Sequence, residues 1–132
     1  MISSTVEDYL RQIHLAQVPG KDAYVSMKQL ARVMKVAPGT ATAMARTLQK
    51  SGLVLYVLRK GVRLTPAGQM RALSIMRRHR LIELFLVKVL DQDWADVHED
   101  AHILEHAVSQ RVEEAMDRVL GHPAVDPHGD PI

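Results

Sequence analysis

Hydrophobic residues recur at helical spacing in three segments of the first fifty residues. The first segment carries Val6, Leu10 and Ile13, and the second follows Ser26, whose hydroxyl is suited to cap a helix. The third runs from about Thr40 to Lys50, after an Ala-Pro-Gly break. Apolar residues at every third or fourth position predict amphipathic helices. Two short helices joined by a tight turn are typical of a helix-turn-helix, although an ordinary helical hairpin fits these two helices equally well.

Two short β-type segments follow these helices. Leu53–Leu58 is rich in aliphatic residues, a basic Arg-Lys-Gly turn comes next, and residues 62–64 form a return strand. A ribbon with a basic tip directly after a helix-turn-helix favours a winged helix, in which one helix enters the DNA major groove and wing cations neutralise phosphates. The predicted DNA contacts are Ala37, Pro38, Gly39, Thr40, Thr42, Ala43, Arg46, Arg59, Lys60 and Arg63.

The second half of the chain predicts three further helices. Thr65 at the N-cap and Pro66 at the first helical position predict the start of a long helix that ends near Leu90. Its second half is apolar over much of its circumference, so it needs more than one packing partner, which fits burial in a dimer. We expect Asp93 to cap the next helix and Ser109 to cap the last one, and we expect the proline-rich tail after Gly121 to lack regular structure. Residues expected to face inward on the last helix are Val112, Ala115, Met116 and Val119.

Candidate metal ligands gather between His98 and His106. At about 100° per residue, His98, His102, Glu105 and His106 share one arc of roughly 100° on a helix, beside a separate apolar stripe. Imidazole nitrogens and carboxylate oxygens suit a divalent first-row metal. The alternative is a solvated helix face whose histidines have no function. In the preceding helix His79 and Glu83, spaced i and i+4, also share one face.

The charge distribution separates the two halves further. Residues 1–80 hold 14 Lys/Arg and 3 Asp/Glu, whereas residues 81–132 hold 3 Lys/Arg and 12 Asp/Glu. This asymmetry of charge indicates that the first half binds a polyanion and the second half binds cations. The absence of cysteine excludes disulfides and thiolate metal sites. Because we find neither a long apolar run nor a signal-peptide pattern, we expect a cytoplasmic protein that does not enter the membrane.

A resemblance to a known family is carried by five stretches: Thr5–Leu10, Gly52–Val54, Leu64–Gly68, Met76–Leu81 and Val97–Ser109. Together they resemble the diphtheria-toxin-repressor family of metal-dependent transcription regulators, and its manganese transport regulator branch in ligand chemistry. The resemblance implies a mainly α-helical homodimer with a winged helix-turn-helix at 1–64, a helical dimerisation and metal-binding domain at 65–120, and a flexible tail at 121–132. It implies a repressor of metal-uptake genes that binds a palindromic operator when a metal corepressor is bound.

The resemblance also implies how the ligands divide between two sites. One site takes Asp8, His102, Glu105 and His106, so that Asp8 of the first helix clamps the two halves of the chain together. The other site takes His79, Glu83 and His98. Iron-responsive members place softer Met and Cys at two of these positions, so the harder ligands here favour Mn²⁺ over Fe²⁺, with Fe²⁺ the alternative. Arg11 replaces a carboxylate of the manganese-type members, which disfavours a tightly coupled two-metal cluster.

Two rival functions fit parts of the same sequence. His102-Ile103-Leu104-Glu105-His106 matches H-x-x-E-H, the inverted zinc-peptidase pattern in which Glu is the general base. Such an enzyme also needs a downstream acidic ligand and a substrate cleft, for which the chain offers little room. A winged-helix regulator without metal, whose histidines sense pH, is the other rival. It predicts DNA binding that follows pH and ignores chelators, and the metal hypothesis predicts the reverse.

Overall fold

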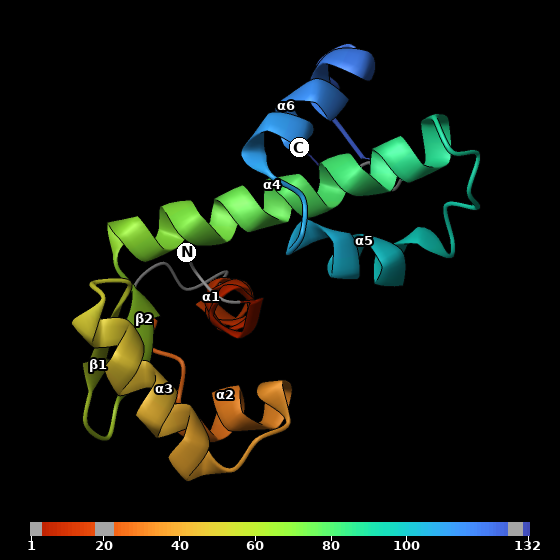
Figure 1. Cartoon of the computed structure of the whole chain (residues 1–132). Helices are drawn as coiled ribbons and strands as arrows, with labels where there is room; N and C mark the ends of the chain where they lie inside the picture. The colour runs from red at the N-terminus through yellow and green to blue at the C-terminus, as the bar shows by residue number, and fades with distance from the viewer. Residues whose placement is uncertain (1–3, 18–22, 127–130) are drawn as a thin grey trace. The chain divides into compact units, whose positions relative to one another are not determined.

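A computed structural model describes residues 4–17, 23–126 and 131–132 (Figure 1). The chain divides into two compact units, Met1–Leu73 and Ser74–Ile132, each of which has its own hydrophobic core. The predicted fold class is confirmed: six helices accompany a single two-stranded antiparallel sheet among the described residues. Each unit is described separately below.

Three helices open the first unit: α1 (Ser4–Gln17), α2 (Met27–Met34) and α3 (Pro38–Lys50). The N-cap of α2 is Ser26, as predicted, and its hydroxyl oxygen accepts a hydrogen bond from the backbone N–H of Gln29 (3.1 Å). The start of α3 at Pro38 lies two residues before the predicted start at Thr40. Proline at the first helical position has a backbone angle already suited to the helix and lacks only an N–H that would have no partner there.

The predicted ribbon follows as β1 (Val54–Val57) and β2 (Gly61–Leu64), paired antiparallel with Val57 opposite Gly61. The turn between them includes Arg59 in the left-handed region (φ 69°). Val25, just before α2, exchanges two backbone hydrogen bonds with Val62 (2.7 and 2.9 Å) and so extends the ribbon by one isolated bridge. This close approach needs glycine at position 61, where a Cβ would lie 2.1 Å from the Val25 carbonyl oxygen.

The core of the first unit joins α1, α2, α3 and the ribbon. One buried polar contact lies beside this core: the Gln17 side-chain oxygen accepts from the backbone N–H of Leu64 (2.8 Å), which ties the end of α1 to β2. The buried core residues are Tyr9, Leu10, Ile13, Val25, Leu30, Ala45, Leu48, Leu53, Val54, Val62, Leu64 and Ala72.

The long helix α4 (Pro66–Lys88) begins in the first unit and continues into the second. Thr65 is its N-cap as predicted, because the Thr65 hydroxyl oxygen accepts from the backbone N–H of Gly68 (3.2 Å). The same hydroxyl donates to the carbonyl of Gly52 (2.6 Å), and the backbone N–H of Thr65 donates to the carbonyl of Leu53 (3.1 Å). The start of α4 is therefore fastened to the chain that leads into β1.

The second unit contains the rest of α4 with α5 (Val97–Glu105) and α6 (Gln110–Val119). The predicted capping of α5 by Asp93 is wrong: Asp96 is the N-cap and makes no side-chain capping bond. Asp93 instead accepts from the backbone N–H of Ala95 (3.0 Å) and so closes the turn before the helix. Ser109 caps α6 as predicted and accepts from the N–H of Val112 (3.2 Å).

The inward face predicted for α6 is only partly correct. Met116 packs against the core of Ile82, Leu86, Val97 and Ala101. Val112 and Val119, which we expected to face inward, are 44% and 67% exposed. A buried acid of α6, Glu113, pairs with two arginines of α4 and thereby contributes to which side of α6 faces that helix.

The tail after Gly121 was predicted to lack regular structure. Residues 127–130 lie outside the described part of the chain. In the described part Val125 pairs with Pro131 in an isolated bridge, and the carbonyl of Pro131 accepts a hydrogen bond from the Arg80 guanidinium (2.8 Å). None of the described helices is long and apolar enough to cross a membrane.

Candidate metal centre

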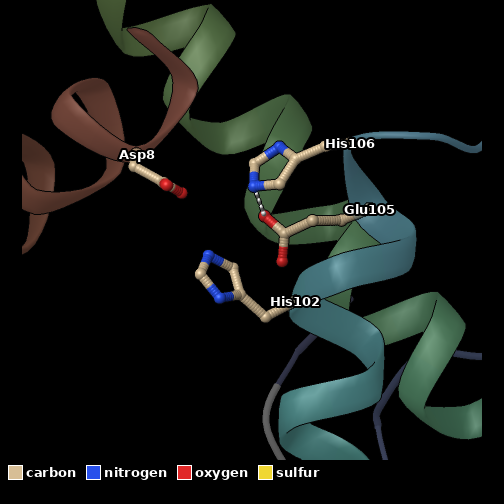
Figure 2. A group of neighbouring side chains, drawn as sticks. All are labelled: Asp8, His102, Glu105 and His106. Carbon is tan, nitrogen blue, oxygen red and sulfur yellow. Dashed lines mark ion pairs between the residues drawn. The ribbon is translucent and has the colours of Figure 1, made fainter. Parts of the chain in front are cut away.

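The last turn of α5 holds three of the predicted metal ligands, His102, Glu105 and His106 (Figure 2). Each of them offers a ligand atom within 4.8 Å of those of the other two. The rings of His102 and His106 have centroids 5.3 Å apart, and His106 Nε2 lies 3.9 Å from Glu105 Oε2. The helix ends at Glu105 and His106 is its C-cap, still in a helical conformation, so the predicted helical spacing extends to this last ligand.

Asp8, the fourth residue predicted for this site, lies on α1 in the first unit and is also drawn in Figure 2. One turn further along α1 is Arg11, whose guanidinium lies 3.9 Å from the Asp8 carboxylate. Burial lowers the pKa of Arg11 below its usual value, and the nearby carboxylates of Asp8 and Glu7 partly counteract that effect. A guanidinium stays protonated in proteins, so Asp8 has a permanent cationic neighbour.

The second predicted group lies within the second unit. His79 and Glu83 come from α4 and are buried, whereas the side chain of His98, at the start of α5, is 78% exposed. Their ligand atoms all lie within 4.8 Å of one another. Oε2 of Glu83 is 3.4 Å from His79 Nε2 and 3.5 Å from His98 Nδ1, and these two ring nitrogens are 3.0 Å apart. This arrangement offers two imidazoles and one carboxylate to a cation.

Two side chains of α4 hold Glu105 from adjacent positions. His79 Nδ1 lies 2.6 Å from Glu105 Oε1, so the imidazole donates to the buried carboxylate. The guanidinium of Arg78 donates to the backbone carbonyl of Glu105 (2.9 Å) and, through Nε, to Glu113 of α6 (2.7 Å). The sequence analysis did not single out Arg78. No spacing rule connects Arg78 to Glu113, 35 positions away, or to the end of α5.

The donor sets of both groups contain only imidazole nitrogens and carboxylate oxygens. Such ligands suit Mn²⁺, Fe²⁺ and Zn²⁺ better than the soft metals that thiolates select. A buried carboxylate is costly unless it is paired, and a bound divalent cation is one partner that repays this cost. The residues present therefore fit a divalent metal.

The predicted DNA-contacting residues lie on the surface of the first unit. Ala37 is the N-cap of α3, and Pro38, Gly39, Thr40, Ala43 and Arg46 are exposed along that helix, with Thr42 half-buried. At the ribbon, Arg59 and Lys60 are exposed in the turn, and Arg63 is half-buried on β2.

Two tyrosines that the sequence analysis did not single out contact these cations. Lys60 Nζ and Arg63 Cζ lie 5.7 and 5.3 Å from the ring centre of Tyr24, and Arg46 Cζ lies 5.8 Å from that of Tyr56. Cations over an aromatic face at this distance are attracted to its electron density. Tyr24 therefore positions two of the wing cations. Its place next to Val25, before the predicted second helix, gave no sign of the bridge that brings it to the wing.

Two family models match this chain. Residues 1–62 match the model described as "Iron dependent repressor, N-terminal DNA binding domain", and residues 65–132 match "Iron dependent repressor, metal binding and dimerisation domain". The matches together cover the winged helix-turn-helix and the helices that carry both ligand groups.

Similar proteins and structures agree with these matches. The iron-dependent repressor IdeR of Mycobacterium tuberculosis is 32% identical over 97% of this chain and 55% of IdeR. An uncharacterized HTH-type transcriptional regulator of Methanocaldococcus jannaschii is 33% identical over 87% of this chain and 91% of that protein. A solved manganese-dependent transcriptional repressor in complex with manganese has 46% identity and a TM-score of 0.83 over 96% of this chain and 57% of that one. The chain thus spans about half the length of IdeR and of the manganese-dependent repressor.

Proposed function

Because this chain belongs to the family of iron-dependent repressors, we propose that it is a metal-dependent DNA-binding transcriptional repressor with Mn²⁺ as its corepressor. The observation that carries the proposal is the last turn of α5, where His102, Glu105 and His106 offer nitrogen and oxygen ligands to one ion. A repressor of this kind acts on the chromosome, so the proposal places the protein in the cytoplasm.

Asp8 completes the first site in this proposal. When bound, the metal supplies a divalent positive charge that a carboxylate and imidazoles of different helices can share. Asp8 belongs to α1 of the DNA-binding unit and the other three ligands to α5, so a bound ion would favour the conformer in which both units contribute ligands. Metal binding would thereby select a conformer competent to bind DNA.

Manganese is favoured over iron by the hardness of the ligands. Asp8 and His102 are an oxygen and a nitrogen ligand, and thiolate or thioether sulfur is absent from both predicted sites. The solved relative with 46% identity is manganese-dependent, and IdeR is iron-dependent at 32% identity. Fe²⁺ remains the alternative corepressor, because affinity order alone does not separate the two metals.

The DNA side of the proposal rests on the exposed residues of α3 and the wing. Thr40, Thr42, Ala43 and Arg46 are small or flexible enough to reach base edges and phosphates, and Arg59 and Lys60 neutralise phosphates. We propose a homodimer that binds the two halves of a palindromic operator, with metal-uptake genes as the regulated class. A two-fold dimer requires two half-sites about one helical turn or a multiple of it apart.

The zinc-peptidase alternative is disfavoured by the surroundings of Glu105. A general base must reach a water molecule beside the substrate. The Glu105 side chain is fully buried and accepts a hydrogen bond from His79 at 2.6 Å. The two matching family models describe the DNA-binding domain and the metal-binding and dimerisation domain of iron-dependent repressors, which supports a regulatory ion at this site over a catalytic one.

The test is binding of the purified protein to a palindromic family operator. It is titrated with Mn²⁺, anaerobic Fe²⁺ and Zn²⁺ and compared with a chelated control at constant pH and salt. We expect tight binding only when metal is present, with Mn²⁺ effective at the lowest free concentration. Equal binding in chelator, with a dependence on pH instead, would overturn the proposal in favour of the pH-sensing regulator.

A further inference from the structure

One imidazole of α4, that of His79, is a member of one ligand group and contacts a member of the other. His79 Nε2 faces Glu83 (3.4 Å) and His98 (3.0 Å), while its Nδ1 faces Glu105 (2.6 Å). Glu105 is in turn a candidate ligand of the other group, with Oε2 directed at His106. Both ring nitrogens of His79 are therefore engaged, each with a different candidate metal site.

The chemistry of the imidazole makes these two contacts interdependent. A neutral imidazole carries one proton, and a nitrogen that binds a metal must be the one without it. Metal at Nε2 therefore leaves the proton on Nδ1, where it is donated to the carboxylate of Glu105. Hydrogen bonds from a histidine to a carboxylate fix the orientation of both groups and change the carboxylate's properties as a ligand.

We propose, resting on the metal-dependent function above, that His79 couples the two sites: an ion bound by His79, Glu83 and His98 orients Glu105 for the ion bound by His102, Glu105 and His106. The second site then raises the affinity of the first through a hydrogen bond, with no ligand shared between the two ions. By thermodynamic reciprocity the first site raises the affinity of the second by the same factor. His79 is in this view a ligand of one site and a positioning residue of the other.

Matched substitutions separate these two roles. His79→Ala and His98→Ala each remove one imidazole from the second site, and of these two imidazoles it is that of His79 that hydrogen-bonds to Glu105. His79→Asn places an amide near the position of Nδ1, so it keeps a donor for Glu105 while it removes the metal-binding Nε2. All three variants leave the ligands of the first site in place.

The measurement is isothermal titration calorimetry of the full chain with Mn²⁺ in the absence of DNA. We expect His98→Ala and His79→Asn to bind one ion with the same dissociation constant within about threefold. His79→Ala is expected to bind it about 10- to 100-fold more weakly, the usual cost of losing a hydrogen-bond partner of a metal ligand. Far-UV circular dichroism and thermal unfolding establish that the compared variants are folded.

A second titration measures the coupling itself. The product of the two stepwise dissociation constants of the wild type is compared with the product of the constants of two single-site variants. These are His106→Ala, which removes a ligand of the first site and retains the second, and His98→Ala, which retains the first. We expect the wild-type product to be smaller by a factor of about 5 to 150. The direction is fixed, because each ion favours the same orientation of Glu105.

The outcomes separate the inference from the proposed function. If the wild type binds no Mn²⁺, both fail. If it binds Mn²⁺ but His79→Ala and His98→Ala have equal constants, the inference fails and the repressor proposal stands. Equal weakening by His79→Asn and His79→Ala, or a product ratio of one, would likewise overturn the coupling.

Discussion

At the scale of single residues, the ligand set is the strongest determinant of the proposed function. Asp8→Asn keeps the size of the side chain but halves its oxygen ligands, and His106→Ala removes one nitrogen ligand. We expect either change to abolish metal-dependent operator binding and to leave the dimer intact, because neither residue belongs to a hydrophobic core cluster. Operator binding measured by fluorescence anisotropy, with gel filtration for the dimer, checks this.

The matched control for Asp8→Asn is Asp100→Asn, an equally conservative change of an exposed acid on α5. It should leave the metal dependence unchanged. If dimeric Asp8→Asn binds the operator with the wild-type metal dependence, Asp8 does not belong to the site.

Two glycines in first turns of helices give a second prediction at this scale. A Cβ at Gly68 would lie 1.9 Å from the carbonyl oxygen of Leu53, whereas a Cβ at Gly39 would meet nothing within 4 Å. We expect Gly68→Ala to lower the free energy of unfolding by about 1–3 kcal/mol, because the added methyl group would overpack this contact. Gly39→Ala should raise it by about 0.4–1 kcal/mol by restricting the unfolded chain. Urea unfolding measures both, and equal shifts would contradict the close approach at Leu53.

The residue roles most readily predicted from the sequence are those that depend only on neighbouring positions in the chain. Ser26, Thr65 and Ser109 were correctly identified as helix caps, because a capping hydroxyl acts within three residues of itself. The contacts of Tyr24 with Lys60 and Arg63, and of Arg78 with Glu113, could not be predicted in the same way. They depend on tertiary packing that joins distant segments.

At the scale of elements, the wing and α3 divide the work of DNA binding. Arg59→Ala or Lys60→Ala should weaken binding by a similar factor on operator and on unrelated DNA, because phosphate contacts carry no sequence information. The slope of log K against log salt should become less steep by about one unit for each lost phosphate contact. Lys88→Ala, at the far end of α4, is the control and should leave the slope unchanged.

A wing substitution that altered the preference among operator sequences while preserving the salt slope would contradict this division. It would assign Arg59 or Lys60 to base edges instead of phosphates.

The order and type of the elements followed from hydrophobic spacing, but α6 shows where this reasoning stops. Its apolar residues predicted an inward face, whereas Glu113 is its buried residue and pairs with Arg77 (2.6 Å) and Arg78 (2.7 Å). A pattern of apolar residues identifies a face only when hydrophobic burial decides the orientation of the helix. Here the two ionic contacts of Glu113 contribute to the orientation of α6. The spacing of apolar residues cannot predict such contacts.

At the scale of the whole molecule, the proposal joins two units with different tasks through one ion and one dimer axis. A two-fold dimer with fixed spacing of its DNA-binding units requires half-sites at a fixed distance. Inserting five base pairs between the half-sites rotates one of them by about half a turn of DNA. We expect this insertion to reduce affinity in Mn²⁺ to that of unrelated DNA.

The control operator has five spacer bases replaced at constant length and should bind as the original does. Affinity that survives the insertion would show that the two DNA-binding units act independently, and the dimeric model of operator recognition would have to be abandoned.

The position of the ligands on α5 has one more consequence. His102, Glu105 and His106 lie at the carboxyl end of the helix, where the aligned peptide dipoles leave a partial negative charge of about half an electron. A positive charge at such an end is stabilised by about 0.3–1 kcal/mol, and a doubly charged ion gains more than a singly charged one. The backbone of α5 would thus contribute to binding the proposed divalent cation in addition to the side-chain ligands. If the same three side chains were placed in the first turn of a helix, all ligand atoms would be kept. The favourable interaction between the helix dipole and the cation would be lost.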